Sequence, residues 1–84
     1  MAKITKEMIA RILAHVGGAA NVAQAGNCMT RLRLTLRDES LADSAAIRQI
    51  DGVMGVIVSD EQFQVELGPG KAQTAAEMMN GVLE

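Results

Sequence analysis

Cys28, Arg31 and Arg33 are the residues of this chain whose types and spacing could do chemistry together. Arg31 and Arg33 are two positions apart in an alternating stretch, so on a strand both guanidinium groups stand on one face, with their backbone positions about 7 Å apart. Like charges side by side are unfavourable unless an anion lies between them. A cysteine attacks as the thiolate, which nearby positive charge favours, and arginines bind phosphoryl groups through charge-assisted hydrogen bonds. The spacing therefore indicates phosphoryl transfer with Cys28 as nucleophile.

The residues between Cys28 and the arginines could complete an anion site. We expect Gly26, Asn27 and Cys28 to form a turn, which would leave the backbone N–H groups of Met29 and Thr30 free to donate to an anion. Thr30 adds a hydroxyl donor. The predicted phosphate-binding set is Arg31, Arg33, Thr30 and the backbone of Met29. Such a set would stabilise charge on the transferring oxygens, with no metal and no cofactor.

Simpler interpretations stand beside this one. A lone cysteine in a small protein is most often a buried hydrophobe, and alternating arginines often form a solvated face or a protected sheet edge. The array also differs from the tyrosine-phosphatase loop, Cys-x5-Arg, because the corresponding position is Leu34.

The remaining pattern predicts the elements that position this array. Thr5 could cap a first helix, which Gly17-Gly18 would end. Asp43 or Ser44 could cap a short second helix. Alternation predicts strands, and the chain from Ala72 fits a last amphipathic helix. The predicted strands are residues 22–27, residues 31–37, Val53 to Val58 and the stretch from Phe63 to Leu67. The order α-β-β-α-β-β-α predicts an α+β open-faced sandwich, a four-stranded, largely antiparallel sheet with three helices on one face.

Composition limits the function further. Eighty-four residues make one small domain, which cannot enclose a deep cavity, so chemistry should lie on the surface and be shared with a partner. A net charge of -2 and a single aromatic, Phe63, argue against nucleic acid as a partner. One cysteine excludes an internal disulfide and a multi-cysteine zinc site, and is typical of an intracellular setting. No apolar run is long enough to span a bilayer.

Four segments together resemble the IIB domains of the bacterial phosphoenolpyruvate:sugar phosphotransferase system, glucose superfamily. Residues 28–34, Cys-Met-Thr-Arg-Leu-Arg-Leu, resemble the family signature C-[AM]-T-R-L-R-[FL]. Residues 17–22 resemble its GG-x-x-N-[IV] segment, residues 51–56 its [DE]GV-x-GV segment, and residues 63–70 its [FQ]QV-x-x-GPG segment. The resemblance covers essentially the whole chain.

The resemblance implies that Cys28 accepts phosphate from a phosphohistidine of a glucose-type IIA protein and passes it to a sugar translocated by a membrane IIC domain. It implies that residues 1–84 form the N-terminal IIB part of a larger IIBC protein, on the cytoplasmic side of the bacterial inner membrane. Gly26 to Thr30 and Gly68 to Lys71 are most similar to the N-acetylmuramic acid branch. The alternative is a IIB domain for a beta-glucoside, sucrose, trehalose or N-acetylglucosamine.

Other features support weaker hypotheses. His15 could relay phosphate, although a plain surface residue is the simpler interpretation, and Gly68-Pro69-Gly70 could touch phosphate or simply turn the chain. Gly52 to Gly55 matches the GxxG loop of RNA-binding KH domains, which needs two flanking helices. A redox-sensing thiol would use the same cysteine without a resolving partner. Met29 and Met54 could form an apolar patch for docking IIA.

Overall fold

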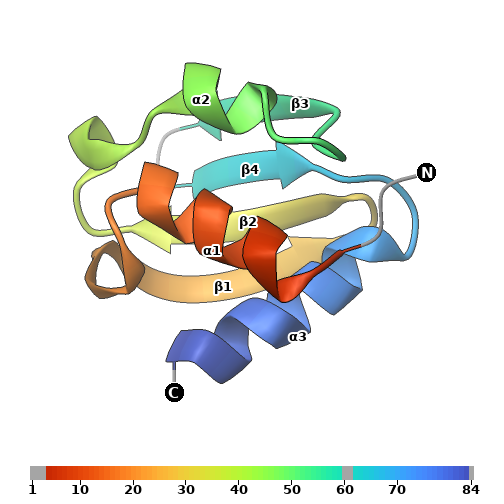
Figure 1. The fold of residues 1–84 in the computed structure, drawn as a ribbon. Helices are drawn as coiled ribbons and strands as arrows, with labels where there is room; N and C mark the ends of the chain where they lie inside the picture. The colour runs from red at the N-terminus through yellow and green to blue at the C-terminus, as the bar shows by residue number, and fades with distance from the viewer. Residues whose placement is uncertain (1–3, 60–61, 84) are drawn as a thin grey trace.

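The computed structural model describes residues 4–59 and 62–83, which form one sheet covered by helices (Figure 1). The element order α-β-β-α-β-β-α is confirmed, with two added 3-10 turns, Ala19–Asn21 and Glu39–Leu41. The elements are α1 (Lys6–His15), β1 (Val22–Cys28), β2 (Arg31–Leu36), α2 (Ser44–Arg48), β3 (Gly55–Ser59), β4 (Gln62–Glu66) and α3 (Lys71–Leu83). Among these residues no helix has both the length and the apolarity needed to cross a bilayer.

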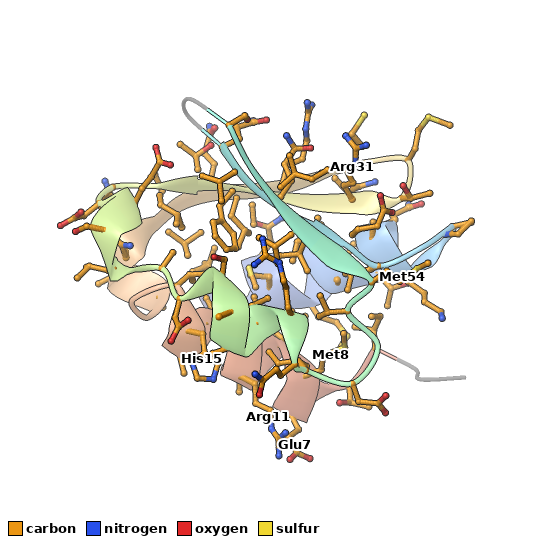
Figure 2. All side chains as sticks on the ribbon, turned by 90° about the horizontal axis from the view of Figure 1, so that it is seen from above. Glu7, Met8, Arg11, His15, Arg31 and Met54 are labelled. Atoms are coloured by element: carbon orange, nitrogen blue, oxygen red, sulfur yellow. The ribbon has the colours of Figure 1, made fainter. Side chains whose placement is uncertain are left out.

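The sheet has the strand order β1-β2-β4-β3, and all three neighbouring pairs are antiparallel. Alternation on β2 separates its two faces, since Leu32, Leu34 and Leu36 are buried against the helices. Phe63 and Val65 of β4 join them in the core. The helices lie on this face, and the opposite face, which we call the outer face, is open (Figure 2). The predicted open-faced sandwich is confirmed.

Helix α1 begins and ends where its sequence predicts. The Thr5 hydroxyl accepts a hydrogen bond from the Met8 N–H at 3.1 Å, and Ile4 packs against the core. The helix ends before two glycines with positive φ, Gly17 at 97° and Gly18 at 88°. Asp43 caps α2 by accepting from the Ala46 N–H at 3.1 Å.

Asn21 joins the end of α1 to the end of β2. Its buried Nδ2 donates to the Val16 carbonyl at 2.7 Å and to the Asp38 carbonyl at 2.9 Å. Its Oδ1 accepts from the Asp38 N–H at 2.9 Å. The side chain thus satisfies three backbone groups at the same place, as a buried polar side chain must.

The predicted turn at Gly26, Asn27 and Cys28 is wrong. These residues continue β1, paired with Arg33, Leu32 and Arg31 respectively. The turn is Met29–Thr30, where Met29 has a φ of 53°. Ladder pairing with β2 outweighs the turn preference of a Gly-Asn pair, because each paired residue satisfies its backbone in the sheet. Likewise β3 begins at Gly55 rather than Val53, whose N–H bonds the Ile50 carbonyl in the preceding turn at 3.1 Å.

Candidate functional site

Cys28 and Arg31 face each other across the β1–β2 ladder at the turn that joins the two strands. Both are exposed, and residues opposite each other in a ladder project from the same face. Arg31 lies on the outer face, away from α1 (Figure 2). Arg33 is two positions further along β2, so it projects from that face as well. The structure therefore brings the three residues of the predicted array together at one end of the open face.

An ion pair holds Arg31. Its Nε lies 3.2 Å from Oε1 of Glu66, its cross-strand neighbour on β4. The Thr30 hydroxyl first, and then Arg31, lower the pKa of the Glu66 carboxyl below its ordinary value. A guanidinium has five N–H donors, so one contact to Glu66 leaves donors for an anion beside Cys28. Neither the alternation of β2 nor the family motif pointed to Glu66.

Arg33 and Gln64 form a second cross-strand pair with unusual chemistry. Gln64 is only 6% exposed although it belongs to the outer face, and its Nε2 is 3.5 Å from the Ser59 hydroxyl. Within residues 4–59 and 62–83, the buried side-chain N or O atoms without a hydrogen-bond partner are Arg33 Nε and Gln64 Oε1. A buried polar atom without a partner is costly and marks a place where function can override stability.

The turn beside Cys28 is hydrogen-bonded to the two residues that follow β4. The Thr30 carbonyl accepts hydrogen bonds from the N–H groups of Leu67, at 2.9 Å, and Gly68, at 3.1 Å. The Gly68-Pro69-Gly70 segment, which leads from β4 to α3, thus begins against the turn. Among the residues that the structure describes, Met29 is the one non-glycine residue with positive φ. This conformation costs roughly 1–2 kcal/mol. Such strain is frequent where a binding loop must hold one shape.

Two exposed methionines lie beside this end of the sheet. Met29 is 85% exposed in the turn, and Met54 is 73% exposed just before β3. The Met54 N–H donates to the Glu66 carbonyl at 2.8 Å, which places Met54 next to the ion pair of Arg31. We call Met29 and Met54 the methionine rim. Large exposed apolar side chains close to a reactive group are typical of a docking surface.

The other candidates of the sequence lie elsewhere. His15 is on α1, on the opposite side of the molecule from Arg31 (Figure 2). The Gly52 to Gly55 segment joins α2 to β3 instead of two helices, so the KH arrangement is not present. In the part of the chain that the structure describes, no three His, Cys, Asp or Glu side chains gather as a metal site would require.

Comparisons with known proteins point to one family. Residues 10–43 match the family described as phosphotransferase system, EIIB. The chain is 66% identical over 84 residues to a PTS system N-acetylmuramic acid-specific EIIBC component of Vibrio vulnificus (strain YJ016), covering 100% of this chain and 17% of that protein. It is 51% identical to the component of the same description in Escherichia coli (strain K12), covering 99% of this chain and 18% of that protein.

A solved structure has the same fold. One domain of the PTS system IIabc component from Clostridium difficile superposes with a TM-score of 0.76 and 26% sequence identity, over 93% of this chain and 81% of that chain. Compared with the EIIBC relatives, the chain is short. It spans about a sixth of their length, 17% for the Vibrio vulnificus protein. The similarity to them extends through every described element, including the Cys28 hairpin.

Proposed function

Because the chain belongs to the EIIB family of the phosphotransferase system, we propose that it carries a phosphoryl group on Cys28. The observation that supports this proposal is the pairing of an exposed Cys28 with Arg31, on the same open face as Arg33. A surface thiol beside two guanidinium groups can accept phosphate from one protein and present it to another. Phosphotransferase activity is therefore the function we assign to this domain.

Two displacements at phosphorus make up the proposed reaction. In the first, the Cys28 thiolate attacks the phosphorus of a phosphohistidine, the S–P bond forms, the N–P bond breaks, and its electron pair returns to the imidazole. In the second, a sugar hydroxyl oxygen attacks the same phosphorus, the O–P bond forms, the S–P bond breaks with its electron pair returning to the Cys28 sulfur, and the hydroxyl proton passes to a base at the acceptor site or to water. Arg31, Arg33 and the Met29 backbone would hold the phosphoryl oxygens in both steps. The Thr30 hydroxyl would join them by turning its single O–H from Glu66 to the phosphoryl group.

The donor we propose is a glucose-type IIA protein, which would dock on the methionine rim around Cys28. Burying Met29 and Met54, which are 85% and 73% exposed, against an apolar surface would exclude water from the transfer. The arginines would meet the negative charge of the phosphohistidine. Replacement of both methionines of the rim should therefore weaken the docking of IIA. The rate at which Cys28 reacts with small thiol reagents should remain unchanged.

The acceptor we propose is N-acetylmuramic acid, bound by a membrane IIC domain. The relatives described as N-acetylmuramic acid-specific EIIBC components support this choice, with identities of 51% to 66%. In a protein of that kind, residues 1–84 would be the IIB domain on the cytoplasmic side of the bacterial inner membrane. A IIB domain for another sugar of the glucose superfamily is the second candidate.

Mass measurement of the phosphorylated domain tests the proposal. The purified chain is incubated with phosphorylated glucose-type IIA, and its intact mass is recorded with time. We expect a gain of one phosphoryl group that is absent in Cys28→Ser. Equal phosphorylation of the wild type and Cys28→Ser would overturn the assignment of Cys28.

A separate measurement distinguishes the redox alternative. If Cys28 were a redox sensor, peroxide would trap it rapidly as sulfenic acid or a mixed disulfide, and phosphorylated IIA would leave its mass unchanged. Sugar choice is tested afterwards, by offering the phosphorylated domain to membranes that hold IIC and comparing N-acetylmuramic acid with N-acetylglucosamine.

A further inference from the structure

The two edges of the sheet are protected to different degrees. On β1, the pairing register shifts between Val22 and Gln24, and Asn80 of α3 donates to the Ala25 carbonyl at 3.1 Å. A bulge, together with a side chain on an edge carbonyl, is a device that keeps other strands from pairing with an edge. The β1 edge is thus occupied by the protein itself.

The other edge, β3, has none of these devices in its described residues. It pairs with β4 from Gly55 to Ser59 without a register shift, and its sequence, Gly-Val-Ile-Val-Ser, has no charge and no proline. Ile57 is 40% exposed and Val58 is 55% exposed. β3 forms the outermost strand opposite β1 (Figure 1). An uncharged, regular, apolar edge of this kind is a template for another strand.

The three central residues of β3, Val56-Ile57-Val58, read the same in both directions, and we propose that the partner of β3 is β3 of a second copy of this chain. With a two-fold axis at Ile57, antiparallel pairing sets Val56 against the partner's Val58 and Gly55 against the partner's Ser59. Opposite residues share a face, so β-branched side chains meet each other. No like charges meet on the strands, and the exposed Val58 gains an apolar neighbour. A two-fold contact requires this self-complementarity.

The pairing leaves Cys28 accessible. Two strands, β2 and β4, separate β3 from β1, on which Cys28 lies. The inference is drawn from the β3 edge alone and does not depend on the proposed function. A stable interface usually buries about 1,200–2,000 Å² in total, more than a single strand pair provides. Self-association is therefore expected to be weak and to depend on concentration.

Thiol crosslinking tests the proposed register. In a Cys28→Ser background, Ile57→Cys places a thiol on the two-fold axis, within reach of its copy. We expect a short bifunctional thiol reagent to crosslink this variant several-fold more than Ala23→Cys, the matched control on the β1 edge, where Ala23 is exposed. A mixture of Gly55→Cys and Ser59→Cys should crosslink between the two variants, and each alone much less.

Sedimentation velocity over a concentration series provides the second readout. The wild type should shift toward dimer as concentration rises, Val58→Lys should remain monomeric, and Ala23→Lys should behave as the wild type. Circular dichroism checks that each variant is folded. Crosslinking of Ile57→Cys no greater than that of Ala23→Cys, or a wild type that is monomeric at every concentration, overturns the inference.

Discussion

Arg33 and Gln64 lie opposite each other on β2 and β4, and each holds a buried polar atom, Nε and Oε1, that has no hydrogen-bond partner. Arg31 and Glu66, the neighbouring pair on the same two strands, are joined at 3.2 Å. One arginine is therefore restrained by a carboxylate, while the other retains unused hydrogen-bonding capacity next to an amide. In the proposed reaction, this free capacity would serve the phosphoryl group.

Replacement of Arg33 should separate activity from stability. Arg33→Ala should slow phosphate transfer from IIA by about 10²–10³-fold, because a donor to the transferring oxygens is lost. It should change the free energy of unfolding by less than about 1 kcal/mol, because the unpartnered Nε contributes no hydrogen bond. Transfer is followed by rapid quench, and unfolding by urea. Arg48→Ala, an exposed control on α2, should leave the transfer rate unchanged; unfolding of Arg33→Ala would contradict its position on the open face.

Replacing the buried amide side chains of Asn21 and Gln64 by Leu should have different effects on the free energy of unfolding. Asn21→Leu should lower the free energy of unfolding by about 2–4 kcal/mol, because three backbone partners within 2.9 Å lose their hydrogen bonds. Gln64→Leu should leave stability unchanged or raise it by up to about 1 kcal/mol, because Oε1 has no partner to lose and Nε2 has only the long 3.5 Å contact with the Ser59 hydroxyl. Urea unfolding of both variants measures the contrast. Equal destabilisation by the two substitutions would contradict the absence of a partner for Gln64 Oε1.

Adding a Cβ atom should destabilise the folded domain at Gly17 and stabilise it at Gly81. At Gly17, with a φ of +97°, it would lie 2.8 Å from Leu41 Cβ and 2.9 Å from Asn21 Nδ2. Backbone strain and overlap together should cost Gly17→Ala about 2–4 kcal/mol. Gly81 is in α3 with nothing within 4 Å, so Gly81→Ala should stabilise by up to about 1 kcal/mol. Thermal unfolding of both compares them; a harmless Gly17→Ala would show that the loop can shift.

The fold was largely predictable because its elements follow from periodicity. Leu32, Leu34 and Leu36 alternate, and this alternation decided which face of β2 is buried. Boundaries were less predictable, since Gly26 and Asn27 have turn propensity but pair with β2 in the structure. Non-local pairing outweighs local preference there, and a single sequence does not show which strand will supply the partner.

The site was predictable only along the chain, from Cys28 to Arg33. Glu66 and Gln64 reach the same face from a strand more than thirty residues later, with Glu66 35 positions from Arg31. Both occupy polar positions in an alternating strand, which sequence alone assigns to solvent. Only the register of β2 with β4 sets them beside the arginines. Asn21 stood within a family segment, but its role as a buried cross-link needs the loop at Asp38 as well.

Acid should weaken the domain partly through Glu66. Its pKa is lowered in the folded state, so its stabilising contribution is complete above the unfolded pKa, about 4.3, and is lost as pH falls through the folded pKa. Urea unfolding between neutral pH and pH 3 should therefore show a smaller loss of stability in Glu66→Gln than in the wild type. A part of the loss should remain, because the pKa of Asp38, beside Ser40, is lowered too.

The cause of the Glu66 shift can be tested directly. The Thr30 hydroxyl is the largest single cause, and Arg31 adds both a hydrogen bond and its charge, so Thr30→Val and Arg31→Gln should each raise the Glu66 pKa, as measured by carboxyl NMR titration. Ser40→Ala is the matched control, since it should raise the pKa of Asp38 and leave Glu66 unaffected. A Glu66 pKa that rises in Arg31→Gln and not in Thr30→Val would mean that charge, rather than the hydroxyl of the turn, keeps Glu66 ionised. In that case a bound phosphoryl group would compete with Glu66 for Arg31.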